Sequence, residues 1–380
     1  VAKGNGGAFA VSRGTISLSN INCTFANNSA GMEGGAFKFQ PGKEGKYVRT
    51  INTIFINNFA AENSGAFQIE DSKSVYNIRC KIIGNSAYAS AGGIYIGRTK
   101  NLTTKNCSFV NNSLTSEIEF LGGGGSAAKF NVITVVTSVN CLYFRNRGSM
   151  QGGAVRLNTI KKYKEINALY KGNCASLRGG AIMAHKINHL QFSFCTFNDN
   201  FAKYSGGTIF GKQTASLINF EIRVTNSTSY REGGVFSLID IKKIHNLFSS
   251  FKENRASKFG GVLYGSQTSS EYYPVILNLH SEFSVNQARE GGIFYLDDVR
   301  SMHNHNCTFQ WAYASSSGGC FYIPDVVYLL NTNCSLTDNH AGMHGGSIYI
   351  ASAKVVDNSY CIFEANSAKR GSGGVLYLEK

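Results

Sequence analysis

Acidic and basic residues recur together after one class of turn, and this pattern is the first in the chain to suggest chemistry. The pairs share the spacing Asp-x-Lys or Asp-x-Arg: Asp71 with Lys73, Asp240 with Lys242, and Asp298 with Arg300. Asp325 places a further carboxylate one repeat after Asp298. Two such carboxylates can bind a cation or act as an acid and base on a glycosidic bond. The alternative is a solvated strip of ion pairs that contributes little free energy. We expect the strip and no enzyme, because the acidic and basic groups are not concentrated in one cluster.

Histidine and cysteine offer no metal site in the sequence. His303 and His305 alternate onto one face, and His340 and His344 flank a turn, but no third ligand stands at a suitable spacing. The chain also has no C-x-x-C pair, the spacing that marks many zinc and redox sites. We therefore expect neither a metal nor another cofactor.

Eight of the ten cysteines occupy equivalent positions in successive repeats. They are Cys23, Cys80, Cys107, Cys141, Cys195, Cys307, Cys334 and Cys361. Two readings are open: disulfides between neighbouring repeats, such as Cys334 with Cys361, or a column of buried thiols that act as small apolar groups. Stacked parallel strands hold equivalent residues ~4.8 Å apart, whereas the Cβ atoms of a disulfide lie about 3.8 Å apart. This comparison favours the thiols.

Eight N-x-S/T sequons mark candidate glycosylation sites. They are Asn22, Asn27, Asn101, Asn106, Asn111, Asn226, Asn306 and Asn333. Four of them directly precede a cysteine of the inward column, so strand alternation directs their side chains outward. A chain rich in Asn, Ser and Thr contains sequons by chance, but this placement favours a secreted glycoprotein.

Tyrosine recurs at one outward position in the last five repeats. The series is Tyr264, Tyr295, Tyr322, Tyr349 and Tyr377. Such an aromatic strip can contact sugar rings or a neighbouring molecule. Alternatively, the rings stabilise the sheet by pairing with one another. The sequence does not decide between these two roles.

The element that positions all these residues is a repeat built around paired glycines. The pairs begin at Gly6, Gly34, Gly92, Gly124, Gly152, Gly179, Gly206, Gly233, Gly260, Gly291, Gly318, Gly345 and Gly373, and Ser64-Gly65 fills the one gap. Most intervals are 27 or 28 residues, a period typical of solenoid proteins. A turn with φ above zero explains glycine at these points.

Asparagine fills a second column in eleven of thirteen repeats. The column contains Asn28, Asn58, Asn85, Asn112, Asn146, Asn173, Asn200, Asn254, Asn286, Asn339 and Asn366, and Ser227 and Ala312 are the exceptions. A large apolar residue stands three positions before it and usually Ala two positions after it, which is the alternating spacing of strands. We expect the amides to form an internal ladder between stacked repeats.

These columns predict an all-β protein, a right-handed parallel β-helix of about 13–14 coils of 27–28 residues with three strands per coil. Residues 1–380 are expected to form one continuous domain, either complete or a segment of a longer chain. Insertions at residues 41–50, 114–123 and 266–275 fall between the predicted strands, where loops are tolerated.

Two motifs within the repeat resemble a known family. Phe25-Ala-Asn-Asn28 precedes Gly34-Gly-Ala-Phe37, and Tyr143-Phe-Arg-Asn146 precedes Gly152-Gly-Ala-Val155. This combination of F-x-x-N and G-G-A-(I/L/V) is similar to the repeats of chlamydial polymorphic outer-membrane proteins. The resemblance covers nearly the whole chain and implies a right-handed β-helix displayed outside the cell, with a role in adhesion or surface architecture.

Composition limits the partners. The formal net charge of +14 favours an anionic partner such as an acidic polysaccharide. The charge is spread along the chain without a basic tail, so nucleic acid is not expected, and no apolar run is long enough to span a membrane. The terminal coils begin and end at the glycine strand without a polar cap, which favours self-association end to end or laterally.

The sequence thus predicts a non-enzymatic, extracellular or cell-surface structural protein. It would form or decorate a surface filament or act as an adhesin. The alternative is a β-helix protein that binds or cleaves polysaccharide, the latter through Asp298, Arg300 and Asp325.

Overall fold

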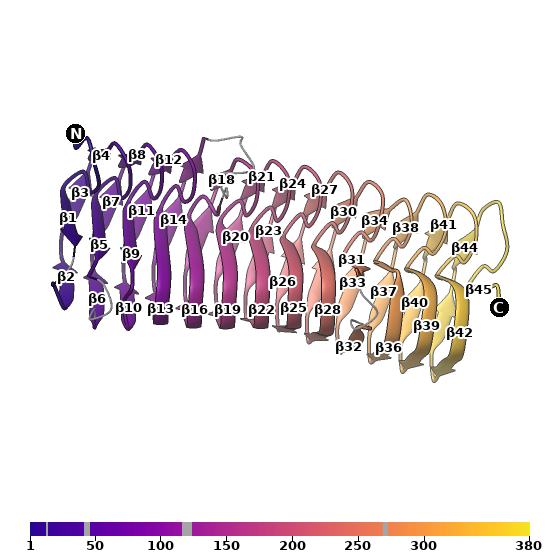
Figure 1. The fold of residues 1–380 in the computed structure, drawn as a ribbon. Helices are drawn as coiled ribbons and strands as arrows, with labels where there is room; N and C mark the ends of the chain where they lie inside the picture. The colour runs from indigo at the N-terminus through magenta and orange to yellow at the C-terminus, as the bar shows by residue number, and fades with distance from the viewer. Residues whose placement is uncertain (13, 42–45, 116–123, 269–272) are drawn as a thin grey trace. The chain divides into compact units, whose positions relative to one another are not determined.

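The computed structural model describes residues 1–12, 14–41, 46–115, 124–268 and 273–380. These residues form strands and turns without a helix, and so no helix among them could cross a membrane. All strands pair in parallel, which confirms the predicted parallel β-solenoid of about thirteen coils with three strands per coil. The chain divides into two compact units, Val1–His189 and Leu190–Lys380. Figure 1 shows the stacked coils of each unit.

One sheet, the long sheet, carries the strands that follow the glycine corners. In the first unit its strands are β1 (Phe9–Ser12), β2 (Ser17–Ile21), β5 (Phe37–Gln40), β6 (Tyr47–Ile51), β9 (Phe67–Glu70), β10 (Ser74–Ile78), β13 (Ile94–Lys105), β16 (Ala128–Val139) and β19 (Val155–Ile166). The division between the units falls within β22 (Ile182–Ser193). In the second unit the strands are β25 (Ile209–Phe220), β28 (Phe236–Leu247), β31 (Leu263–Ser266), β32 (Val275–Leu279), β35 (Phe294–Leu296), β36 (Asp298–His305), β39 (Phe321–Thr332), β42 (Ile348–Ser359) and β45 (Leu376–Leu378).

The second sheet, the three-residue sheet, carries the large apolar residue of each repeat. Its strands in the first unit are β3 (Thr24–Ala26), β7 (Ile54–Ile56), β11 (Lys81–Ile83), β14 (Ser108–Val110), β17 (Leu142–Phe144) and β20 (Leu169–Lys171). Those in the second unit are β23 (Thr196–Asn198), β26 (Arg223–Thr225), β29 (Ser250–Lys252), β33 (Glu282–Ser284), β37 (Thr308–Gln310), β40 (Ser335–Thr337) and β43 (Ile362–Glu364).

The third sheet, the two-residue sheet, follows the asparagine column. Its strands in the first unit are β4 (Ser29–Ala30), β8 (Phe59–Ala60), β12 (Ser86–Ala87), β15 (Ser113–Leu114), β18 (Arg147–Gly148) and β21 (Cys174–Ala175). Those in the second unit are β24 (Phe201–Ala202), β27 (Thr228–Ser229), β30 (Arg255–Ala256), β34 (Gln287–Ala288), β38 (Tyr313–Ala314), β41 (His340–Ala341) and β44 (Ser367–Ala368).

The long sheet differs from the sequence prediction in one respect. The two alternating runs that follow each glycine corner merge into a single twelve-residue strand in coils without an insertion, such as β13 and β39. In the first unit a residue with positive φ bends these strands near their middle, as at Arg98 and Thr159. The predicted insertions overlap the strands at their edges, because residues 47–50 belong to β6 and residues 114, 266 and 275 are strand ends. Residues 42–45, 116–123 and 269–272 of these insertions fall outside the described residues.

The asparagine ladder is confirmed in both units. In the first unit the Nδ2 and backbone N–H groups of each ladder Asn from Asn28 to Asn146 donate to Oδ1 of the next Asn at 2.9–3.1 Å. The same Nδ2 group also bonds a carbonyl of the preceding coil, as Asn112 does to Ile82 at 2.8 Å. In the second unit Asn254 bonds Asn286, and Asn339 bonds Asn366. Each amide therefore satisfies corner backbone groups that burial would otherwise leave unpaired.

A second internal ladder, which the sequence analysis missed, lies on the long sheet of the second unit. Each Nδ2 group donates to the next Oδ1 at 2.7–2.8 Å along Asn219, Asn246, Asn278, Asn304, Asn331 and Asn358. In the first unit the equivalent column holds Thr50, Asn77, Thr104, Ser138 and Glu165, because register pairs these residues coil by coil.

The two glycines of a corner serve different needs. The first has positive φ, as at Gly34 (68°), and Ser64 takes the same conformation at 65° where glycine is absent. The second has no room for a side chain: a Cβ atom on Gly35 would lie 2.0 Å from the carbonyl oxygen of Gly65. Hydrogen bonds place Gly92 opposite Gly65, the second residue of its corner. The glycine pairs that begin at Gly92 and Gly124 are therefore shifted by one residue along the chain relative to the pairs of the other coils.

Candidate functional site

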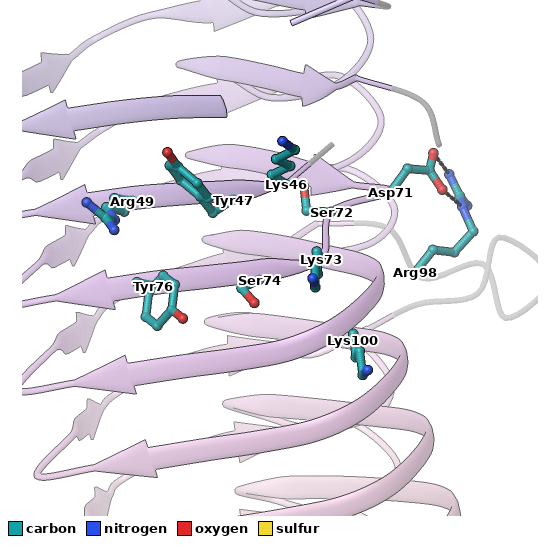
Figure 2. A pocket seen from close by; sticks show the side chains of 10 residues that line it. All are labelled: Lys46, Tyr47, Arg49, Asp71, Ser72, Lys73, Ser74, Tyr76, Arg98 and Lys100. Atoms are coloured by element: carbon teal, nitrogen blue, oxygen red, sulfur yellow. Dashed lines mark hydrogen bonds and ion pairs between the residues drawn. The ribbon is translucent and has the colours of Figure 1, made fainter. Parts of the chain in front are cut away.

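A cleft of about 830 Å³ lies on the outer side of the long sheet in the first unit. Residues at and before the starts of β6 and β10 and in β13 line it, and Figure 2 shows their side chains on successive coils. The lining contains the cations Lys46, Arg49, Lys73 and Lys100. All four are exposed, so their charges face the solvent of the cleft.

Strand register brings three of these lysines into one column. Ser74 pairs with Tyr47 on one side and Asn101 on the other, so the preceding residues Lys46, Lys73 and Lys100 are also neighbours. The backbone confirms this register, because Ser74 N–H donates to Lys46 O at 3.0 Å and Asn101 N–H to Lys73 O at 3.1 Å. Parallel strands repeat at about 4.8 Å, and the ammonium groups therefore emerge one coil apart. We call this set the lysine column.

Two tyrosines lie beside the lysine column. Tyr47 is exposed and Tyr76 is half-buried, and both line the cleft. The guanidinium of Arg49 lies 5.0 Å from the centre of the Tyr47 ring, a distance at which a cation is attracted to an aromatic face. The cleft thus combines cations with aromatic surface.

The carboxylate in the cleft is neutralised by an arginine of the next coil. Arg98 donates through Nε to Asp71 Oδ1 at 2.6 Å and through a second nitrogen to Oδ2 at 3.0 Å. Arg98 also contacts Glu70. Asp71 therefore pairs with Arg98 and not with Lys73, the residue that shares its sequence motif. Within the described residues no ion pair joins the lysine column or Arg49 to an acid.

Charge is divided unequally between the units. Residues 1–189 contain 22 Lys and Arg against 8 Asp and Glu, whereas residues 190–380 contain 15 of each. The net charge of +14 therefore belongs to the first unit. The expectation that the charge is spread along the chain is wrong. It rested on the absence of a basic tail, and it did not compare the net charges of the two halves of the chain.

Basic residues continue beyond the cleft on the same sheet. Register places Thr134 and then Lys161 after Lys100. A smaller cleft of about 300 Å³ lies here, and Lys161 and Lys186 line it. The basic surface of the first unit therefore extends from β6 to the part of β22 within that unit.

Only some of the acidic residues that the sequence motif marks in the second unit lie close to one another. Asp298 and Asp325 pair directly on neighbouring coils. Burial, and then the charge of Asp325, raises the pKa of Asp298. Burial, and then the charge of Asp298, raises the pKa of Asp297 to about 6. Asp240 is buried and accepts hydrogen bonds from Thr268 N–H at 2.8 Å and Thr268 Oγ1 at 2.9 Å, so its carboxylate holds the segment that follows β31.

No cluster of three or more His, Cys, Asp or Glu residues suited to a metal ion occurs in the described part of the chain. His340 bonds Ser367 and His344 bonds the backbone of Ser372, while the rings of His280 and His305 contact each other. None of the ten cysteines, all of which lie in the described part of the chain, forms a disulfide, and seven of them are buried. Cys80 donates its thiol to Thr50 O at 3.1 Å and Cys307 to Asn278 O at 3.3 Å.

The tyrosine strip of the second unit is present and its rings stack on one another. Centroid distances along Tyr264, Tyr295, Tyr322, Tyr349 and Tyr377 are 5.6, 5.0, 4.5 and 5.5 Å, with interplanar angles of 28°, 5°, 7° and 17°. Neighbouring rings therefore cover the faces that a sugar would contact. This geometry supplies the sheet-stabilising pairing considered from the sequence, and glycan binding by the strip stays a prediction.

Seven of the eight sequon asparagines occupy corners with φ of 50–55°, and all seven are exposed: Asn22, Asn27, Asn106, Asn111, Asn226, Asn306 and Asn333. Asn101 instead lies half-buried in β13. Asparagine tolerates this left-handed conformation better than most residues, which is a structural reason for its presence at these corners. Glycosylation stays a prediction.

No family model, curated protein or solved structure matches the chain. The resemblance to polymorphic outer-membrane protein repeats therefore stays a prediction. The lysine column was missed because Lys46 lies within the predicted insertion at residues 41–50, which was expected to be a loop and was not aligned with the later repeats. The signal available in the sequence was their constant spacing of 27 residues from Lys46 to Lys73 to Lys100.

Proposed function

We propose that the chain is a non-catalytic β-solenoid that binds an anionic polysaccharide through the basic cleft of its first unit. The observation that carries the proposal is the lysine column. Lys46, Lys73 and Lys100 present three cations in a line beside two tyrosines, and none of them forms an ion pair with another described residue. An extended acidic polysaccharide carries carboxylate or sulfate groups at a regular spacing, and a straight row of cations complements such a chain.

Several features favour a polysaccharide over other anionic polymers. The spacing of the lysine column, about 4.8 Å, is close to the length of one sugar residue in an extended chain. Tyr47 and Tyr76 offer apolar ring surface for the carbon–hydrogen face of a sugar. Both tyrosines stand on strands that are paired with their neighbours coil by coil, so the backbone need not be ordered on binding. Display at a cell surface, as an adhesin or a matrix component, would place this cleft in contact with such polymers.

Calorimetric titration of the whole chain with a galacturonic acid decasaccharide and a heparin-derived decasaccharide tests the proposal. The triple variant Lys46→Gln, Lys73→Gln, Lys100→Gln should bind at least one of them about tenfold more weakly, since each lost exposed charge contact is worth roughly 0.5 kcal/mol. Affinity should also fall as salt is raised, because exposed charges are screened.

The matched control removes the same total charge from the second unit, with Lys203→Gln, Lys258→Gln and Lys369→Gln. These lysines are exposed and lie outside the cleft, and their loss should leave affinity nearly unchanged. Equal weakening by the two triple variants would assign binding to net charge alone and reject the site. Tighter binding of a short DNA duplex than of either decasaccharide would indicate a nucleic-acid partner instead.

A further inference from the structure

The second unit has a cleft of different character, at a corner between the long sheet and the three-residue sheet. Its volume is about 370 Å³, and Phe248 and His280 line it together with Glu221, Arg223 and Glu282. It lies beside β26, β29 and β33, three neighbouring strands of the three-residue sheet, of which β26 and β33 are labelled in Figure 1. Two carboxylates and one guanidinium surround two aromatic rings.

The backbone at this corner does not suit the residues that it carries. In every coil of the second unit the residue equivalent to Phe248 has positive φ. These residues are Phe194 (55°), Glu221 (49°), Phe248 (52°), His280 (46°), Asn306 (51°), Asn333 (51°) and Tyr360 (55°). Asn accepts this conformation readily, whereas a bulky aromatic residue in it is strained. Phe248 is also 53% exposed. Neither backbone preference nor burial accounts for phenylalanine at this position.

The rings at the corner form a continuous apolar surface. The rings of Phe248 and His280 stack with centroids 5.0 Å apart and an interplanar angle of 2°, and Phe220 meets Phe248 edge to face at 6.0 Å. Phe248 keeps about half of its surface exposed in spite of these contacts. The apolar surface therefore remains open to the cleft.

A third strained aromatic residue lies on the coil after that of His280. His280 stands before the start of its strand, β33, whereas the third residue stands after the end of β37. Trp311, the single tryptophan of the chain, directly follows β37 with φ of 52° and is 54% exposed. Between the two aromatic ends, Gln310 Nε2 lies 3.5 Å from Glu282 Oε1, and Ser284 Oγ donates to the same oxygen at 3.2 Å. Ser284 is buried, whereas Glu282 is exposed and Gln310 half-buried. The face of β33 and β37 thus has aromatic groups at both ends and the polar groups of Glu282 and Gln310 between them.

We propose that this face of the second unit binds a neutral oligosaccharide. Phe248, His280 and Trp311 contact the apolar faces of sugar rings, and Glu221, Arg223 and Glu282 bond their hydroxyl groups. A few polar groups around an apolar surface are typical of small-molecule sites. A neutral ligand is favoured because the second unit carries equal numbers of acidic and basic residues and the cleft holds more carboxylates than cations. The proposal does not depend on the anionic site of the first unit.

The test is calorimetric titration of the whole chain with cellohexaose, chitohexaose, laminarihexaose and mannohexaose. At least one should bind saturably and change the fluorescence of Trp311. Phe248→Gly and Trp311→Gly, which permit positive φ, should each weaken that binding about tenfold. Tyr360→Gly is the matched control, because Tyr360 has φ of 55° and is 86% exposed outside the cleft, and it should bind as the wild type does.

Circular dichroism melting of each variant separates lost binding from lost folding, and only variants that melt like the wild type are compared. Absence of saturable binding with all four sugars, or unchanged affinity in both Phe248→Gly and Trp311→Gly, overturns the proposal. Sedimentation that reveals a dimer abolished by Phe248→Gly also overturns it and assigns the face to self-association.

Discussion

Glu165 accepts a hydrogen bond from the hydroxyl of Tyr170 at 3.0 Å in the core of the first unit. Both side chains are fully buried. Ser138 Oγ donates to Glu165 Oε1 at 2.6 Å, and the hydroxyl of Tyr163 donates to Oε2. Burial raises the pKa of Glu165 to about 7, although the three hydroxyl donors act in the opposite direction. The column position that Glu165 occupies holds Asn in much of the second unit, and here it holds a titratable group.

This carboxyl makes the stability of the fold depend on pH. Its pKa is higher in the folded than in the unfolded chain, so the folded state binds the extra proton. Stability is therefore greatest below pH 4.5, declines as pH rises from 4.5 to about 7, and is constant with respect to this group above that. The loss should be about 3 kcal/mol, from roughly 1.4 kcal/mol per unit of pKa.

Unfolding in urea at a series of pH values measures this loss. Glu165→Gln should remove the decline between pH 4.5 and 7, because the amide does not titrate. Glu62→Gln is the control, since Glu62 is an exposed carboxyl of the same unit, and it should keep the wild-type profile. A decline of the same size in Glu165→Gln and wild type would show that Glu165 is not the responsible group.

The asparagine ladder that contains Asn85 and Asn112 gives a second prediction. Asn112→Ala removes the Oδ1 atom that accepts from both the backbone N–H and Nδ2 of Asn85. The buried backbone N–H of Asn85 then lacks a partner, and its Nδ2 group keeps only its bonds to the carbonyls of Phe55 and Ile83. Each of the two lost bonds costs roughly 1–3 kcal/mol. The free energy of unfolding should fall by about 2–5 kcal/mol.

Asn28→Ala is the matched comparison within the same ladder. Asn28 is half-buried and donates to Asn58. Its loss removes only the Nδ2 donor, and Asn58 Oδ1 still accepts from the backbone N–H of residue 28, so the cost should be at most about 1 kcal/mol. Equal destabilisation by the two substitutions would mean that the ladder contributes through side-chain packing and not through paired amides.

Much of this architecture could be predicted from the sequence, because identical columns stack and each column has its own chemical requirement. Asn112 and its equivalents revealed the inner ladder, and Gly35 revealed the corner. The second ladder was missed because its column mixes Asn246 and Asn278 with Thr50 and Glu165 elsewhere in the chain. No single residue type marks it.

The candidate sites were harder to foresee for a related reason. They depend on which side chains of different coils are neighbours, and insertions change the sequence spacing between neighbouring coils. The shift from 27 residues between Asn85 and Asn112 to 34 between Asn112 and Asn146 is one such change. The strained corners at Phe248 and Trp311 were not visible at all, because positive φ was expected only at glycine.

The close contact at the glycine corner gives a third expectation. A Cβ atom on Gly35 would lie 2.0 Å from the carbonyl oxygen of Gly65 and 2.6 Å from that of Phe59. Both neighbours are backbone atoms that cannot turn away, so Gly35→Ala should force coils apart and cost several kcal/mol, roughly as overpacking does. Gly4→Ala is the control, because no atom lies within 4 Å of its Cβ position. Thermal melting should separate the two variants clearly, and equal melting temperatures would contradict this account of the corner.

The thiols should react according to burial. Cys80, Cys107, Cys141, Cys195, Cys307, Cys320 and Cys334 are buried, whereas Cys23, Cys174 and Cys361 are half-buried. Burial raises the pKa of the Cys320 thiol and of the Cys174 thiol, and only a thiolate is alkylated efficiently. Brief treatment of the native protein with iodoacetamide should therefore label the three half-buried cysteines first and leave Cys320 unlabelled. Mass spectrometry after denaturation and a second, isotopically distinct label gives the fraction protected at each position. Recovery of Cys334 and Cys361 in one disulfide-linked peptide would instead favour a covalent link between coils over the thiol column.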